Sequence, residues 1–251
     1  MFVFDEIEGK RILKSTLLKD VKHFFTTREI PLSNGSLNDL KDTCTENRII
    51  VSKYLGICAE NLLFPTQTHT DNVDIAASAK KEYIDTDALV TDKHNIALGL
   101  NFADCVPVIL WDKILNVGGI AHAGWRGTAK KIAEKTVITL CEKYGSKPAN
   151  ILAAIGPAIG KEFFSVDLNV FEQLKNSLPL KYDNYWDYSK EENKYYLDLK
   201  YMNYLQLREV GVEKIDLCGY CTCASNDIFF SYRKENGLTA RHSAVLKLEE
   251  Q

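Results

Sequence analysis

The chain has 251 residues, which suits one domain better than two, and its 45% hydrophobic and 26% charged residues are ordinary for a globular protein. The formal net charge is −3 and no basic stripe gathers on a predicted element, which excludes a protein built to bind nucleic acid. No run of about 18 apolar residues could span a membrane, and the acidic N-terminal stretch lacks the features of a signal peptide. We therefore expect one domain over residues 1–251.

The seven cysteines are an odd number, scattered along the chain at positions 44, 58, 105, 141, 218, 221 and 223. Secreted disulfide frameworks are usually short, dense in cysteine and even in count. We therefore expect a cytoplasmic protein in a reducing compartment, with each cysteine a free thiol or a metal ligand.

The first part of the chain alternates short apolar runs with polar turns. Residues 2–4 and 21–25 are such runs and predict strands. The segment Pro31–Asn38 is rich in Pro, Ser, Asn and Gly, which is typical of a loop. A helix is predicted from Glu46 to about Leu55, with Gly56 as its C-terminal cap.

The middle of the chain is the most regular part. Four short apolar runs predict consecutive buried strands, at residues 87–91, 96–100, 106–111 and 117–123. A helix is predicted next, because apolar residues recur at helical spacing from Ala129 to Tyr144 and Gly145 can close it. Another buried strand is predicted at residues 150–155.

The last part begins with a polar, tyrosine-rich stretch, Lys181–Tyr196, that predicts a surface insertion. A helix is expected after Asp198, ending at Gly211, and three strands follow it at residues 214–218, 227–232 and 243–248. Strands interleaved with helices indicate an α/β (α+β) class, a single domain with mixed β-sheets flanked by helices. The hairpin-like strand spacing argues against a purely parallel, doubly wound sheet.

Three candidate ligands for a soft metal lie where side chains reach a surface. His69 is in a polar turn, Cys105 immediately precedes a predicted strand, and His122 lies near the end of another. Two imidazoles and a thiolate with one open position suit catalytic zinc, which lowers the pKa of bound water toward neutrality. The spacing matches no compact zinc motif, so a buried thiol beside two structural histidines stays an alternative.

A glycine-rich turn, GWRGT at 124–128, lies between a predicted strand and the predicted helix. The glycines Gly124 and Gly127 let backbone N–H groups approach an anion, and Arg126 offers a fork that matches phosphate. The alternative is an ordinary strand-to-helix turn with an exposed arginine.

A different chemistry is open to the same residues. Cys105 as nucleophile, His122 as base and Asp104 as the group that orients the base would make a cysteine hydrolase. Adjacent residues on an extended chain point to opposite sides, so this triad requires a turn at Asp104.

The remaining polar motifs carry less chemistry. We expect Cys221 and Cys223 to pack as small apolar groups, and His23, His94 and His242 to be structural. Arg233 follows an aromatic run and either reaches a cleft or lies on the surface.

These segments together resemble the laccase-domain proteins, which include bacterial cytosolic multicopper polyphenol oxidases, purine nucleoside phosphorylases and peptidoglycan editing factors. The resemblance covers most of the chain, and AHAGWRGT with ADCVP is its most specific part. The matching motifs are TTREIPLSNGSLN (26–38), ENR (46–48), QTHTDNV (67–73), DALVTD (87–92), ADCVPVILWD (103–112), AHAGWRGT (121–128), GPAIG (156–160), CT (221–222), FFSYR (229–233) and TAR (239–241).

The resemblance implies that His69, Cys105 and His122 are metal ligands, with zinc as the expected ion and copper possible. It implies phosphorolysis of adenosine, inosine, guanosine and methylthioadenosine, together with adenosine deamination, so purine nucleosides and phosphate are the expected partners. It is also the reason to expect Arg28 to hold substrate. Asp104 is the nearest candidate for a general acid or base.

The sequence departs from the family pattern at three places. It has QTHT where the family often has Q-V-H-G, and TAR where the family often has T-G-R. Glu162 and Phe163 stand where cysteines often follow G-P-x-I-G. Soft ligands for additional copper ions are therefore scarce, which disfavours a phenol oxidase.

Three functions remain open: a metal-dependent purine nucleoside enzyme, a cysteine hydrolase acting on misloaded cell-wall precursors, and a zinc-bearing binding module without activity. No feature of the sequence indicates an oligomeric state.

Overall fold

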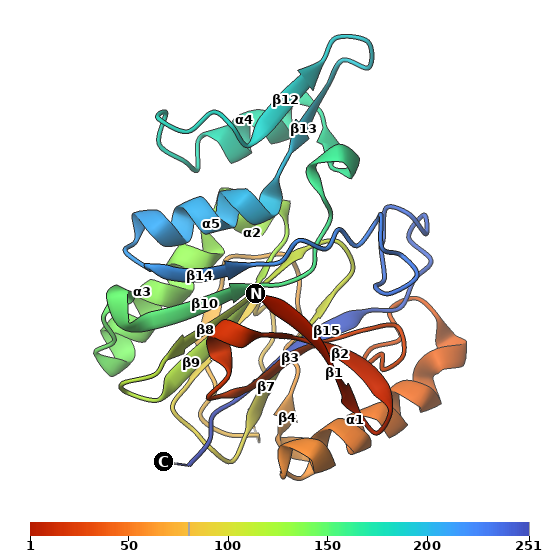
Figure 1. Ribbon diagram of the computed structural model, residues 1–251, viewed down its shortest axis with the longest axis vertical. Coiled ribbons are helices and arrows are strands. Elements are labelled where there is room, and N and C mark those ends of the chain that lie inside the picture. The colour runs from red at the N-terminus through yellow and green to blue at the C-terminus, as the bar shows by residue number, and fades with distance from the viewer. Residues whose placement is uncertain (80, 251) are drawn as a thin grey trace.

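A computed structural model describes residues 1–79 and 81–250, and its strands form two six-stranded sheets and one small sheet (Figure 1). The first sheet has the order β1 (Phe2–Ile7), β2 (Lys10–Ser15), β3 (Lys22–Thr26), β15 (His242–Lys247), β7 (Ala97–Phe102) and β4 (Leu62–Leu63). The second has the order β14 (Lys214–Leu217), β10 (Ile151–Ile155), β8 (Val106–Asp112), β9 (Val117–Ala123), β6 (Ala88–Thr91) and β5 (Val73–Ile75).

The two large sheets pack face to face through their central strands, which are buried on both faces. In β8, Ile109 and Trp111 join the core between the sheets, whereas Val108 and Leu110 join the core under the helices. In β15 the alternation is the same, with Leu246 between the sheets and Val245 on the outer face. Side chains of a strand point alternately to its two faces, so these runs need cover on both sides.

Helices provide that cover. Helices α2 (Trp125–Ala129), α3 (Ile132–Tyr144) and α5 (Leu199–Glu209) lie over the second sheet, and α1 (Lys41–Leu55) lies over the first (Figure 1). The result is a sandwich of helix, sheet, sheet and helix. The prediction of mixed sheets flanked by helices is confirmed.

A small projection extends from this sandwich (Figure 1). It consists of α4 (Leu168–Lys175) and a sheet of order β11 (Ser165–Val166), β13 (Lys194–Leu197) and β12 (Trp186–Ser189). The stretch predicted as a surface insertion supplies its β12–β13 hairpin. The ring of Phe171 stacks on Tyr195 at 4.0 Å, so the projection has an aromatic core of its own.

The predicted strand at 227–232 is wrong: this segment is a series of turns. The backbone N–H of Phe229 donates to the carbonyl of Ser225 at 2.9 Å, and that of Ser231 donates to the Glu235 carboxylate at 3.0 Å. Backbone donors satisfied by turns and side chains do not seek a neighbouring strand, despite the apolar sequence.

Two helix boundaries also differ from the prediction. Helix α1 begins at Lys41, one turn before the predicted Glu46. The predicted helix 129–144 is α3, which begins three residues late at Ile132, because Lys131 adopts a left-handed conformation with φ of 63° after the end of α2 at Ala129. Gly56 and Gly145 do cap their helices with φ of 72° and 75°.

All seven cysteines are free thiols. Within residues 1–79 and 81–250, no helix is both long and apolar enough to cross a membrane.

Candidate metal centre

The register of the second sheet brings Cys105, His122 and Asp87 together. Strands β8 and β9 are antiparallel with Pro107 opposite His122, so Cys105, immediately before β8, lies beside the end of β9. Strand β6 flanks β9 on the other side with Ala88 opposite Ala121, which places Asp87 next to His122. Antiparallel pairing thus joins residues that are far apart in the sequence.

Asp87 fixes the ring of His122. Its carboxylate lies 2.7 Å from Nδ1 of His122, and its backbone carbonyl accepts the His122 N–H at 2.8 Å. Both residues are buried. A carboxylate on Nδ1 leaves Nε2 as the nitrogen that faces Cys105.

The same carboxylate holds the loop that carries His69. Asp87 accepts backbone N–H bonds from Thr68 at 3.2 Å, from His69 at 3.2 Å and from Thr70 at 2.7 Å. His69 has φ of 63°, a left-handed conformation that is uncommon for a side chain other than glycine. Bonds from three successive residues hold this turn, and they place the His69 ring 4.9 Å from that of His122.

Gly124 provides the space for this cluster. A Cβ atom built at Gly124 would lie 3.0 Å from the Sγ of Cys105 and 3.1 Å from the His69 ring. Any side chain at this position would displace one of the candidate ligands. The predicted glycine-rich turn therefore lies against the cluster.

Burial and charge act in opposite directions on the two innermost groups. Burial raises the pKa of the Cys105 thiol, but the charges and hydrogen bonds of His122 and His69 lower that pKa to about 6. Burial lowers the pKa of His122, but the Cys105 thiolate and Asp87 raise that pKa to about 9. The protein environment thus favours the thiolate, the form of cysteine that binds metal.

The donor atoms of His69, Cys105 and His122 all lie within 4.8 Å of one another. Bonds of 2.0–2.3 Å in a tetrahedral site require donors roughly 3.3–3.8 Å apart, so small side-chain rotations would close the set. Two imidazoles, a thiolate and a carboxylate behind one imidazole fit zinc, and also copper.

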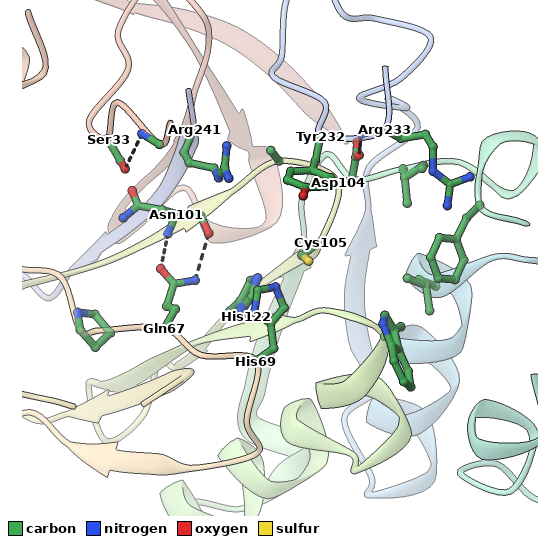
Figure 2. Close-up of a pocket in the computed structure, with 17 residues that line it drawn as sticks. Ser33, Gln67, His69, Asn101, Asp104, Cys105, His122, Tyr232, Arg233 and Arg241 are labelled. Atoms are coloured by element: carbon green, nitrogen blue, oxygen red, sulfur yellow. Dashed lines mark hydrogen bonds between the residues drawn. The ribbon is translucent and has the colours of Figure 1, made fainter. Parts of the chain in front are cut away.

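The cluster lines a cavity of about 590 Å³ (Figure 2). On one side of His69 and His122 lie the polar residues Ser33, Gln67, Asn101 and Arg241, and on the other side lies Arg233. Apolar and aromatic side chains complete the wall, namely Pro65, Ala103, Trp125, Ile159, Phe164, Leu199 and Tyr232. The size and the mixed lining are those of a small-molecule site.

Asp104 does line the cavity, but its carboxylate is used elsewhere. It accepts the hydroxyl of Thr222 at 2.7 Å and the backbone N–H of Arg233 at 2.7 Å. The chain turns at Asp104, where φ is 85°. The role predicted for Asp104, orienting His122, therefore falls to Asp87.

Arg126 is not among the residues that line the cavity. It is exposed on α2, and its guanidinium lies over the Trp125 ring at 4.3 Å. Gly127 is buried, where an added Cβ would lie 3.2 Å from the His122 carbonyl. The glycines of the turn therefore contact the cluster, whereas the Arg126 side chain lies over Trp125 and does not line the cavity.

Arg28 braces the loop at 226–235 and does not line the cavity. Its guanidinium donates to the Asn226 carbonyl at 2.5 Å, pairs with Glu235 at 2.5 Å and lies over the Phe230 ring at 4.4 Å. These contacts account for a structural role, and the substrate-holding role predicted for Arg28 finds no support in its position.

Arg233 reaches the cavity, one of its two predicted outcomes. Its guanidinium donates to the Phe163 carbonyl at 2.8 Å and contacts the Ser165 hydroxyl. These two contacts connect the loop at 226–235 to the base of the projection. Cys221 and Cys223 pack against the core under the helices, as predicted.

Sequence reasoning missed Asp87 and Arg241. The signal for Asp87 was a carboxylate at the start of an otherwise apolar run, DALVT, where a buried acid needs partners. The signal for Arg241 was its place directly before the last apolar strand.

The chain is similar in sequence to proteins of one known family. The family described as multi-copper polyphenol oxidoreductase laccase matches residues 22–249. The chain is 32% identical over 252 residues to purine nucleoside phosphorylase YlmD of Bacillus subtilis, covering 92% of this chain and 90% of that protein. It is 32% identical over 236 residues to a purine nucleoside phosphorylase of Deinococcus radiodurans, covering 91% and 89%.

Solved structures share the fold. The crystal structure of YlmD from Geobacillus stearothermophilus matches with a TM-score of 0.88 at 29% identity, covering 100% of both chains. That of the hypothetical protein YfiH from Bacillus licheniformis matches with a TM-score of 0.87 at 32% identity, covering 98% of this chain and 99% of that one.

Proposed function

Because the chain belongs to the multi-copper polyphenol oxidoreductase laccase family, we propose that it is a metal-dependent purine nucleoside phosphorylase centred on His69, Cys105 and His122. The observation that carries the proposal is the convergence of these three donors in the wall of one cavity. Relatives named purine nucleoside phosphorylase, aligned over about nine-tenths of the chain, support the substrate class.

The cavity suits a nucleoside and a small anion together. Its volume of about 590 Å³ lies within the usual range for small-molecule sites. Trp125 and Phe164 offer aromatic surface to a planar purine. The amide of Gln67 bonds the backbone of Asn101 at both ends and keeps one N–H of Nε2 for a hydroxyl of ribose.

The proposed reaction transfers a ribosyl group to phosphate. An oxygen of hydrogenphosphate forms a bond to C1′ of the ribose while the bond from C1′ to the purine nitrogen breaks. The electron pair leaves with the base, which takes the proton of hydrogenphosphate. The products are a free purine and ribose 1-phosphate.

The residues of this chain prepare the site for that step. A bound zinc ion would supply Lewis acidity, which stabilises negative charge that develops nearby. Asp87 keeps the proton of His122 on Nδ1, so that Nε2 is free to bind. Gly124 leaves room for Cys105 and His69, which a side chain at this position would displace.

We extend the proposal to methylthioadenosine phosphorolysis and adenosine deamination, in which water replaces the amino group as ammonia leaves. Zinc is the proposed ion, and copper fits the same donors. In the described part of the chain only one group of three or more such ligands occurs, which supports a single ion and disfavours a phenol oxidase. The free thiols support a reducing compartment, such as the cytoplasm.

Product analysis tests the proposal. We expect purified zinc-loaded protein to convert inosine to hypoxanthine and ribose 1-phosphate only when phosphate is present. Adenosine without phosphate should yield inosine and ammonia if the deaminase activity is real. Failure to cleave any of the four purine nucleosides with phosphate would exclude the phosphorylase.

A cysteine hydrolase acting on a misloaded cell-wall precursor is a second candidate. The specific observation in its favour is that Cys105, His122 and Asp87 form a chain of thiol, imidazole and carboxylate. The lowered pKa of Cys105 would make the thiolate a nucleophile near neutral pH. Asp87 takes the orienting role that the sequence assigned to Asp104.

His69 separates the two candidates, because it is a ligand in the first and stands outside the chain of Cys105, His122 and Asp87 in the second. We expect His69→Ala to lose both zinc and nucleoside turnover, and a strong chelator to reproduce that loss in the wild type. Zinc should also slow alkylation of Cys105, because the ion occupies the thiolate lone pair. Near-normal activity in His69→Ala, with rapid alkylation regardless of chelator, would move the assignment to the hydrolase.

A further inference from the structure

Arg241 lies in the cavity wall without an acidic partner. Within residues 1–79 and 81–250 its guanidinium forms no ion pair. Nη1 of Arg241 donates hydrogen bonds to the carbonyls of Thr239 at 2.7 Å and Ala240 at 2.9 Å. The guanidinium has five N–H donors, so Nε and Nη2 keep their donors for a ligand. Figure 2 shows the side chain directed into the cavity.

The carboxylates near Arg241 are already used. Asp104 accepts hydrogen bonds with both oxygens, from Thr222 and from the Arg233 backbone. Glu235 pairs with Arg28 at 2.5 Å. A half-buried cation without a direct ion-pair partner is costly: burial lowers the pKa of Arg241, and the negative groups around it, Cys105 foremost, offset this only in part. An anion supplied by a ligand would remove that cost.

The surrounding loop holds the guanidinium in place. The backbone N–H of Arg241 donates to the Ser33 carbonyl at 2.9 Å. A Cβ built at Gly35 would lie 2.8 Å from Nη1 of Arg241, so the guanidinium rests against a glycine with φ of 55°. The Tyr232 ring lies 5.9 Å from Cζ of Arg241. A guanidinium held this way is preorganised for an anion.

Further donors lie on the same side of the cavity. Ser33 supplies a hydroxyl at the wall. Asn101 accepts the Ser243 hydroxyl at Oδ1, at 2.8 Å, which leaves Nδ2 as a donor. A guanidinium, an amide and a hydroxyl match the oxygens of a tetrahedral oxyanion.

We propose that Arg241, with Ser33 and Asn101, forms the subsite for the anionic co-substrate, and that this anion is inorganic phosphate. The identity of the anion as phosphate rests on the proposed phosphorylase function. The subsite lies on the cavity side that carries Gln67, apart from the exposed Arg126 to which the sequence assigned phosphate binding.

Phosphate binding to the zinc-loaded full chain tests the proposal, measured by calorimetry with and without inosine at constant ionic strength. We expect Arg241→Gln to weaken phosphate binding at least 10-fold, and the phosphate KM to rise in parallel. Inosine affinity should change less than about 3-fold. Arg241→Lys keeps the charge but loses the planar fork, so an intermediate loss is expected.

Arg48→Gln is the matched control. Arg48 is also half-buried, donates to the Leu32 carbonyl at 2.7 Å and lies 4.5 Å from the Phe64 ring, but it does not line the cavity. We expect unchanged phosphate affinity in this variant. Zinc content and circular dichroism check the fold of each variant. If Arg241→Gln does not fold, the proposal is tested with Arg241→Lys, which should weaken phosphate binding at least 3-fold.

The outcomes separate this subsite from the proposed function. Phosphate binding that depends on Arg241, without cleavage of any nucleoside, keeps the anion subsite and rejects the phosphorylase. Phosphate-dependent cleavage with a wild-type phosphate KM in Arg241→Gln rejects the subsite and keeps the phosphorylase. A loss in Arg126→Gln but not in Arg241→Gln returns the role to Arg126. A wild type that binds no phosphate, with or without inosine, rejects the subsite.

Discussion

Asp87 organises both histidines of the candidate metal centre. One buried carboxylate contacts the ring of His122 and the backbone around His69. Burial raises the pKa of Asp87, but hydrogen bonds from His122 and Thr70 lower it to about 2, so the carboxylate stays charged. The charge of Asp87 therefore makes His122 a stronger candidate ligand, and its oxygens position the loop that carries His69.

We expect Asp87→Asn to weaken zinc binding by about 10- to 100-fold, the usual effect of losing a partner of a ligating histidine. The amide keeps the volume but loses the charge and one acceptor oxygen. Zinc affinity measured by chelator competition checks this expectation, together with kcat at saturating zinc.

Asp112→Asn is the control for this substitution. Asp112 is equally buried and accepts backbone N–H bonds from Ile114 and Leu115, but it does not line the cavity. A similar loss of zinc affinity in both variants would mean that Asp87 acts only through general stability.

At the scale of elements, the backbone is strained at the residue that separates α2 from α3. Lys131 has φ of 63° between the two helices, a conformation that costs a residue with a side chain about 1 kcal/mol. Its Nζ pairs with Glu134 at 3.1 Å on the surface, where such pairs contribute little. Lys131 thus separates α2, whose N-cap is Gly124, from α3.

Lys131→Gly should therefore stabilise the protein by somewhat less than about 1 kcal/mol, because glycine adopts this conformation without strain. The expected rise in melting temperature is below about 2–4 °C, the shift that a full 1 kcal/mol gives for a chain of this size. Thermal unfolding followed by circular dichroism measures it. Lys130→Gly removes a neighbouring lysine at φ of −96° and should give no gain; an equal gain there would contradict the explanation by strain.

At the scale of the whole molecule, four layers bury titratable groups that take no part in the site. His23 accepts the Ser15 N–H at Nε2 and bonds the Val21 carbonyl through Nδ1, so the neutral ring is fully satisfied. Burial lowers its pKa from 6.5 to about 4. Burial likewise lowers the pKa of His242 to about 3, beside the rings of Phe102 and Phe229.

Acid should therefore destabilise the fold before most carboxylates titrate. The unfolded chain binds protons at these histidines near pH 6.5, whereas the folded chain does not. Their contribution is thus fully present above about pH 6.5 and is lost as pH falls toward about 4. For His23 alone the loss is about 3 kcal/mol, because each pKa unit corresponds to about 1.4 kcal/mol.

Urea unfolding between pH 4.5 and 6.5 measures this dependence. We expect one cooperative transition, as for a single domain, and an unfolding free energy that falls with decreasing pH. His23→Gln should reduce the mean slope over this range by about 1 kcal/mol per pH unit, somewhat less than the value for one whole proton. Equal slopes in the variant and the wild type would exclude His23 as a source of the acid sensitivity.

The sequence by itself determined the elements whose pattern is local. Runs such as VPVILW are apolar on both faces and predict buried strands wherever they pack, and Gly56 and Gly145 mark helix ends through backbone freedom alone. Residue types and the family resemblance also pointed to His69, Cys105 and His122 as candidate ligands, because few side chains bind a soft metal.

Only the tertiary structure decided the partners of those residues. Strand register placed Asp87, and not Asp104, beside His122, and packing around Gly35 placed Arg241, and not Arg126, in the cavity wall. The segment 227–232 has strand composition but satisfies its backbone through Glu235 and short turns. Register, packing and hydrogen-bond partners arise between segments distant in the chain, so no local pattern of residues encodes them.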